Sequence, residues 1–181
     1  MKKLILIGGD LAGGKSTFAN ILRDKFNILV INKDRLKEIV GDTIIVDNRE
    51  DNKKLSVISF NIMKYLIEKN DSVLVLESNF KNYEMAEIKN LIIELGYDVL
   101  SIVFKGDNQI LQERFLNRLN ENRHYVHKSQ DFTNIDDFIK VLDDLRAVEY
   151  PGKVINVDCN DFSYQDNEDI YNRIKKFIEK R

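Results

Sequence analysis

Residues 8–17 read GGDLAGGKST, and two of their side chains, Lys15 and Ser16, are suited to binding phosphate and a metal ion. From Gly9 the stretch matches G-x-x-x-x-G-K-[ST] and lies between an apolar run and a helical pattern. Glycines let a loop turn its N–H groups around a phosphate, and the following helix adds the positive end of its dipole. This context favours a nucleotide-binding loop over a glycine-rich turn before an ordinary helix. The residues expected around the phosphates are Gly9, Ala12, Gly13, Gly14, Lys15, Ser16 and Thr17.

A carboxylate that could complete a metal site follows another apolar run, in VLVLESNF at 73–80. Glu77 stands at the C-terminal end of that expected strand, the edge at which open α/β sheets bind ligands. Because a phosphate loop needs a carboxylate to hold Mg²⁺ directly or through water, we assign Ser16 and Glu77 to the metal. Aspartate is commoner in this role, and the alternative is a charged residue that simply ends a strand. Asn79 could orient the substrate or a water, or could be a turn residue.

A second carboxylate lies in INKDRLKEI, which follows the second expected strand. Asp34 falls at the C-terminal edge of that strand, where it could accept a proton from an attacking hydroxyl. The alternative is that Asn32 or Asp34 caps the helix that starts at Arg35. Arg35 and Lys37 are candidates for the substrate pocket or are solvated helix positions.

Arginines recur in residues 110–127, ILQERFLNRLNENRHYVH. Arg114 and Arg118 share one helix face, and Arg123 follows at the helix end. Guanidinium groups beside a polar segment suit a lid that offsets charge on a γ-phosphoryl group in the transition state. The alternative is a solvated face paired with Glu113 and Glu121. We assign phosphate contact to Arg118 and Arg123, whereas Arg114 fits either interpretation.

The elements that must position these residues alternate between apolar strands and helical patterns. Strands are expected over 3–7, 28–32, 72–77, 98–104 and 153–158. Helices are expected over 15–25, 34–40, 53–69, 82–95, 108–121, 134–147 and 166–180, with 43–48 unassigned and 122–133 irregular. Because several strands are continuously apolar, both faces of the sheet should be covered, which predicts a parallel sheet with right-handed crossovers.

Composition narrows the class of protein further. A chain of 181 residues suits one domain, and 43% hydrophobic content is enough for a core. The net charge of -2 lacks the basic excess of most nucleic-acid binders. One cysteine permits no internal disulfide, and the apolar stretch from Leu4 to Ile7 is too short for a signal peptide or a membrane span. We expect a cytoplasmic protein with no membrane partner.

Read in order, GGDLAGGKST, NKDRLK, VLVLESNF, RFLNRLNENRH and VINVDCNDF resemble the P-loop kinases of the adenylate-kinase-like group. The similarity is greatest to the small ATPase/kinase proteins related to polynucleotide kinase, zeta toxins and chloramphenicol phosphotransferase, and it covers nearly the whole chain. It implies one α/β domain over 1–181 with the three-layer P-loop NTPase fold. A five-stranded parallel sheet of order 2-3-1-4-5 would be flanked by helices, with a small helical lid at about 114–133. It also implies ATP and Mg²⁺.

The resemblance bears on individual residues as well. In polynucleotide kinases the segment that resembles NKDRLK holds a catalytic aspartate and, three residues on, an arginine. Those positions are Asp34 and Lys37 here, which favours Asp34 as the base, although a lysine cannot recognise phosphate in a bidentate manner. The family's aspartate after the third strand is Glu77, and its lid arginines correspond to Arg118 and Arg123.

The function expected from these residues is ATP-dependent transfer of a γ-phosphoryl group to a hydroxyl of a small molecule. Lys15, Asp34, Arg118 and Arg123 would be catalytic, and Asp34, Lys37 and Asn79 would bind the acceptor. One alternative is a polynucleotide 5′-hydroxyl kinase, which needs a basic channel for single strands. Another is a nucleotide-binding, kinase-like protein without transfer activity. The resemblance leaves the acceptor open, because the family phosphorylates nucleic-acid ends, sugars, antibiotics and nucleotide sugars.

Overall fold

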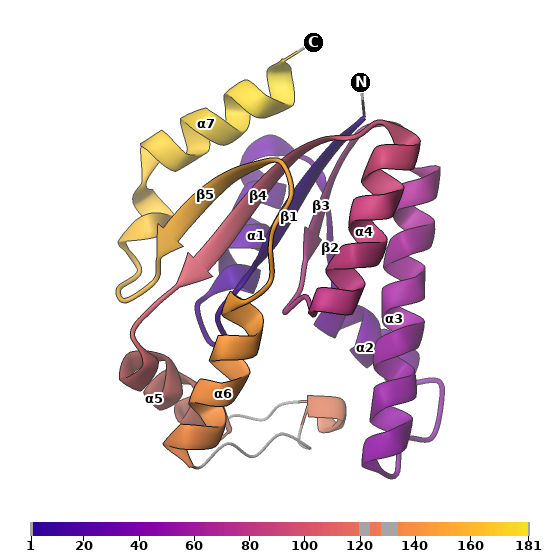
Figure 1. The fold of residues 1–181 in the computed structure, drawn as a ribbon, viewed down its shortest axis with the longest axis vertical. Coiled ribbons are helices and arrows are strands. Elements are labelled where there is room, and N and C mark those ends of the chain that lie inside the picture. The colour runs from indigo at the N-terminus through magenta and orange to yellow at the C-terminus, as the bar shows by residue number, and fades with distance from the viewer. Residues whose placement is uncertain (1, 120–123, 128–133, 181) are drawn as a thin grey trace.

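The computed structural model describes residues 2–119, 124–127 and 134–180. Its strands form one parallel sheet in the order β2-β3-β1-β4-β5, which confirms the expected topology (Figure 1). The strands are β1 (Lys3–Gly9), β2 (Leu29–Asn32), β3 (Val73–Glu77), β4 (Asp98–Lys105) and β5 (Lys153–Asp158). Since all strands run the same way, their C-terminal ends meet at one edge of the sheet.

Helices cover both faces of the sheet, as the apolar strands require (Figure 1). The helices are α1 (Lys15–Phe26), α2 (Lys33–Gly41), α3 (Arg49–Lys69), α4 (Asn82–Leu95), α5 (Asn108–Leu119), α6 (Ile135–Arg146) and α7 (Glu168–Glu179). Short 3-10 turns occur at Tyr125–His127 (η1) and Ser163–Asp166 (η2). On one face α1 and α7 pack against the sheet, and on the other α3 and α4 do.

Two apolar clusters separate these layers. Alternate residues of β1 point to opposite faces, so Ile5 and Ile7 join the cluster that contains Phe18 of α1, while Leu4 and Leu6 join the other. All four β1 side chains are completely buried, because this strand is at the centre of the sheet. The phosphate loop therefore follows one of the best-packed segments in the molecule.

Asparagine caps explain where the helices differ from their expected limits. The helix expected from 53 begins at Arg49, because the Asn48 side chain accepts hydrogen bonds from the N–H groups of Glu50 and Asp51. In the same way, Asn167 caps α7, which starts at Glu168. Gly96 caps the C-terminus of α4 in the left-handed conformation. Residues 43–48 form no strand.

The expected lid lies partly outside the described residues. The described parts of 114–133 are the end of α5 and the η1 turn, and Arg123 falls in an undescribed stretch. In the part of the chain that the structure describes, no helix combines the length and apolarity needed to cross a bilayer.

Candidate functional site

The phosphate loop connects β1 to α1 and depends on backbone conformations that suit glycine. Gly9 has a φ of 102°, and a Cβ atom there would lie 2.2 Å from the carbonyl oxygen of Phe104. Gly14 has a φ of 85° and directly precedes α1. Ala12 also has a positive φ, 56°, a conformation that costs an alanine more than a glycine. The loop thus keeps a left-handed backbone conformation at position 12, although the residue there is alanine.

Lys15 lies beneath this loop with its side chain almost fully buried. Its ammonium donates hydrogen bonds to the backbone carbonyl oxygens of Gly9 and Asp10. Burial lowers the pKa of Lys15, and the nearby carboxylates of Glu77 and Asp10 oppose that shift. The cation is therefore held at the loop by backbone oxygens and by the field of two carboxylates.

Glu77 and Ser16 meet at the C-terminal edge of the sheet. The Ser16 hydroxyl donates to Oε2 of Glu77 over 3.1 Å. Burial raises the pKa of Glu77 to about 7, against the opposing effect of Lys15. A bound cation would restore the charged form of this carboxylate, because a nearby positive charge favours ionisation.

The donor set at this point fits Mg²⁺. One hydroxyl and one carboxylate are hard oxygen ligands, and Mg²⁺ in phosphate-transfer sites keeps several waters and uses one or two carboxylates with the substrate phosphates. Within residues 2–119, 124–127 and 134–180, no group of three or more His, Cys, Asp or Glu side chains could hold a metal without other ligands. The arrangement around Ser16 and Glu77 therefore suits a metal that arrives with a nucleotide.

Asn32 resolves the ambiguity about the cap of α2. Its Oδ1 atom accepts a hydrogen bond of 2.7 Å from the N–H of Arg35, so Asn32 is the cap and Asp34 is not. The Nδ2 atom of Asn32 donates to Glu77 and to the Ser16 hydroxyl. In the sheet Asn32 is paired with Glu77, since both residues end their strands. Its role at the site was missed because a cap explained the residue fully in the sequence.

Asp34 lines the same cleft as the phosphate loop. The side chains that line the cleft include Lys15, Ser16, Asp34, Lys37 and Glu77. Asp34 is close enough to Lys15 and Glu77 to affect both of their pKa values. The structure therefore brings together the phosphate loop, the end of β3 and the first turns of α2, as the sequence predicted.

Lys37 and Asn79 form a second part of the cleft wall. Burial lowers the pKa of Lys37; Asp34 opposes the shift, and Lys33 and Lys81 add to it. The Oδ1 atom of Asn79 is buried and accepts no hydrogen bond in the described part of the chain. Buried polar atoms normally have partners, so this oxygen is suited to receive a ligand's N–H or O–H group.

Of the three arginines noted in residues 110–127, the structure describes Arg114 and Arg118, and these two have different surroundings. Arg118 lines the cleft and is near enough to Glu77 to lower that group's pKa. Arg114 instead donates to the carbonyl oxygens of Cys159 and Asn160 at 2.5 and 2.6 Å, and its guanidinium lies 4.3 Å from the ring centre of Phe162. Arg114 therefore braces the loop after β5, while Arg118 is available to a phosphate.

Residues 124–127, which include the η1 turn, contact α2 and its C-cap residue through both histidines of the chain. His124 lies 2.9 Å from Asp42, and His127 lies 3.1 Å from Glu38. Val126 and His127 reach the cleft that contains the phosphate loop. This described part of the expected lid thus borders the cleft opposite the sheet.

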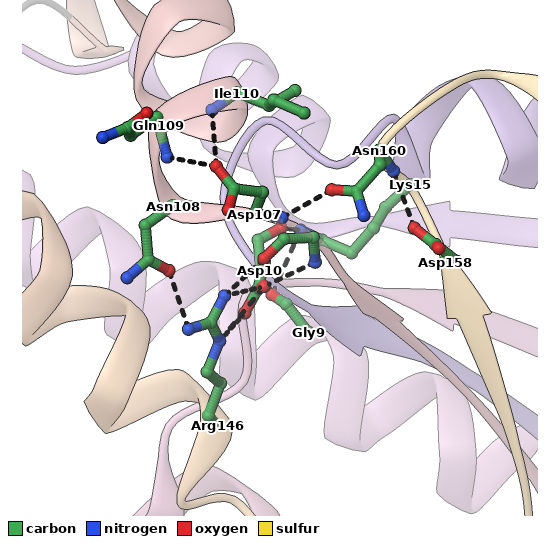
Figure 2. Close-up of polar contacts among 11 residues, drawn as sticks. Gly9, Asp10, Lys15, Asp107, Asn108, Gln109, Ile110, Arg146, Asp158 and Asn160 are labelled. Carbon is green, nitrogen blue, oxygen red and sulfur yellow. Dashed lines mark hydrogen bonds and ion pairs between the residues drawn. The ribbon is translucent and has the colours of Figure 1, made fainter.

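An ion pair between a buried residue of the phosphate loop and a half-buried arginine was not anticipated. The Asp10 side chain is completely buried and pairs with Arg146 at the end of α6 (Figure 2). Asp10 stands at one of the variable positions of the loop motif, so the pattern contains no signal for it. Arg146 is separated from Asp10 by more than 130 residues in the sequence, and only the fold joins them.

Comparison of the sequence with models of known families and with curated proteins gave no match. Solved structures do match. A proposed kinase from Chloroflexus aurantiacus has a TM-score of 0.82 at 21% identity, with 98% of this chain and 99% of that one covered. Shikimate kinase from Bacteroides thetaiotaomicron has a TM-score of 0.61 at 16% identity, with 98% of each chain covered. A gluconokinase from Sinorhizobium meliloti 1021 has a TM-score of 0.57 at 13% identity, covering 98% and 94%.

At sequence identities of 13% to 21%, the structural similarity establishes the fold and not the activity. The chain has the α/β architecture of small P-loop kinases, with the sheet order predicted from the sequence.

Proposed function

We propose that this protein is an ATP- and Mg²⁺-dependent phosphotransferase that moves a γ-phosphoryl group to a hydroxyl of a small molecule. The observation that carries the proposal is the shared cleft, where Lys15 and Ser16 of the phosphate loop lie with Glu77, Asp34 and Arg118. These five come from the loop, β3, α2 and α5, and each has a distinct use in phosphoryl transfer. The similarity to small-molecule kinase structures supports the same conclusion.

The donor half of the reaction would rely on positive charge and backbone N–H groups. Lys15 and the loop glycines would hold the terminal phosphates, and Ser16 and Glu77 would hold Mg²⁺, which screens charge on the transferring group when bound. Arg118 would offset charge on the γ-phosphoryl oxygens, and Arg123, which lies outside the described residues, is proposed for the same role.

The acceptor half would rely on Asp34. Its carboxylate is free of the capping role and would orient the acceptor hydroxyl and take its proton as the new O–P bond forms. Lys37 would contact the acceptor as a point charge, and Asn79 Oδ1 would accept a hydrogen bond from it. The whole chain, 1–181, would act as one catalytic domain.

An ADP-release assay with Mg-ATP tests the proposal. The acceptor panel should contain nucleosides, sugars, antibiotics, 5′-hydroxyl oligonucleotides and the hydroxy acids shikimate and gluconate, which appear in the names of two similar structures. We expect at least one small hydroxylated compound to stimulate ADP release, and Lys15→Ala to reduce that rate by about 1,000-fold. Lys140→Ala, an exposed position on α6, is the matched control and should retain the rate.

Three outcomes discriminate among the candidate functions. Stimulation by a small molecule supports the proposal. Stimulation by oligonucleotides alone, with binding that fades steeply as salt is added, would instead identify a polynucleotide kinase. Nucleotide binding in a calorimeter without turnover across the panel would favour a kinase-like protein that does not transfer phosphate.

A further inference from the structure

A single guanidinium connects three segments beneath the phosphate loop (Figure 2). Arg146 binds the Asp10 carboxylate in a forked arrangement, with Nε 3.0 Å from Oδ1 and Nη2 2.6 Å from Oδ2. The same group donates to the carbonyl oxygen of Gly106 and to Oδ1 of Asn108, both at 2.8 Å. The N–H of Gly106 in turn donates to Oδ2 of Asp10. The hydrogen-bond partners of this guanidinium thus belong to the phosphate loop, the β4–α5 connection and the start of α5.

The location of Asp10 raises an electrostatic problem. Its carboxylate is buried inside a loop whose expected ligand is a polyphosphate, and a like charge there repels the ligand. Arg146 neutralises the carboxylate directly, and the remaining hydrogen bond comes from the N–H of Gly106. Without Arg146, the buried Asp10 carboxylate would lose its ion-pair partner and leave a negative charge in the loop. Without Asp10, the Arg146 guanidinium would leave a positive charge beside the loop.

The backbone of Asp10 links the ion pair to the phosphate-binding lysine. The carbonyl oxygen of Asp10 accepts a hydrogen bond from Lys15, so the residue that Arg146 holds also holds the lysine. At the other side, Asn108 is the first residue of α5, and α5 extends from there to Arg118 in the cleft. Arg146 therefore ties the position of Arg118's helix to the position of Lys15.

We propose that Arg146 is a positioning residue for phosphate transfer. It neutralises Asp10 and fixes the phosphate loop relative to α5, and it makes no contact with the nucleotide itself. This inference rests on the proposed nucleotide-dependent function. It predicts that loss of Arg146 weakens nucleotide binding whereas loss of the Asp10 carboxylate does not, because removal of each leaves a different charge behind.

The test is a double-mutant cycle read by calorimetric Mg-ATP affinity, with ADP-release kinetics and melting temperature measured on the same samples. Arg146→Gln should raise the Kd for Mg-ATP by about tenfold, since it leaves the carboxylate bare. Asp10→Asn should leave the Kd unchanged or lower it. The double variant Asp10→Asn/Arg146→Gln should recover most of the lost affinity, even if Arg146→Gln alone folds poorly. Arg23→Gln, which breaks an exposed pair with Asp24, is the control with the same substitution.

The results separate positioning from a merely structural role. If the pair only stabilises the fold, both single variants lower the melting temperature, and the folded fraction of each binds Mg-ATP as the wild type does; that result overturns the inference. Equal weakening by Asp10→Asn and Arg146→Gln would also overturn it. Wild-type protein that bound no Mg-ATP would refute the proposed function together with the inference, whereas normal wild-type binding with an unaffected Arg146→Gln variant refutes the inference alone.

Discussion

The two halves of the cleft differ in how far their polar groups are already paired. On the donor side, Lys15, Ser16 and Glu77 all make hydrogen bonds within the protein. On the acceptor side, the side chains of Asp34 and Lys37 make no hydrogen bond or ion pair with the described residues, and the Oδ1 atom of Asn79 is likewise unpaired there.

The position in the sheet explains this difference. The donor side follows β1, the central strand. Lys15 donates to the carbonyl oxygens of Gly9 and Asp10, and Ser16 donates to Glu77 at the end of the neighbouring β3. The acceptor side follows β2, an edge strand whose residues are exposed or half-buried, and is completed by α2 and the end of β3. In the proposed reaction, the nucleotide half would be preorganised, whereas the acceptor half would contain groups whose partner is the ligand.

Among the variants that test this comparison, the largest effect should come from Asp34→Asn, which breaks the acceptor half alone. Loss of the general base should reduce acceptor-stimulated ADP release by about 100-fold or more. The Kd for Mg-ATP should not rise, because Asp34 does not cap α2 and loss of its negative charge near Lys15 removes a repulsion of the phosphates. Steady-state kinetics and calorimetry on the same preparation measure the two quantities. An unchanged turnover would remove Asp34 from the mechanism.

A smaller effect is expected from Glu77→Gln, which alters the donor half. The amide keeps the hydrogen-bonding shape but loses the charge that a cation needs, so half-maximal activity should require roughly tenfold more Mg²⁺. Titration of ADP release with Mg²⁺ at fixed ATP tests this, with Glu87→Gln on the exposed side of α4 as a control. An identical Mg²⁺ dependence in the two proteins would contradict the assignment of Glu77 to the metal.

The smallest effect on activity is expected from Lys37→Met, and this variant should be more stable than the wild type. Since burial lowers the pKa of Lys37, the folded state disfavours its charged form, and removal of the charge should raise the melting temperature at pH 7. The unfolded chain binds that proton more tightly. Wild-type stability should therefore rise with pH from the depressed pKa of the folded state up to about 10.4, and Lys37→Met should lack this rise.

Thermal melts of both proteins from pH 7 to 10 check this prediction. Steady-state kinetics at pH 7 should show a higher KM for the acceptor in the variant. A lower melting temperature for Lys37→Met at pH 7 would indicate that Lys37 stabilises the fold and that the acceptor half is not held ready for a ligand.

Much of the fold was predictable because it depends on local patterns. Apolar runs such as LILI and VLVL indicate buried strands. The phosphate-loop motif between a strand and a helix indicates which edge of the sheet binds the ligand. The predicted start of α3, residue 53, was wrong by four residues, because the prediction did not use the Asn48 cap. The predictions for Lys15, Ser16, Asp34 and Glu77 came from their positions after strands, and the structure places all four in one cleft.

The amino-acid sequence by itself determined the phosphate loop, the alternation of strands and helices, and the edge of the sheet where the charged residues gather. These follow from periodicity and from backbone chemistry within short segments. Only the tertiary structure decided that Asn32 is the cap of α2, that Arg114 braces the loop after β5, and that Asp10 is neutralised by Arg146. The cap is a local contact between Asn32 and the N–H of Arg35, and the sequence left open whether Asn32 or Asp34 made it. The other two contacts join residues far apart in the sequence, so their partners are set by how the sheet and helices pack.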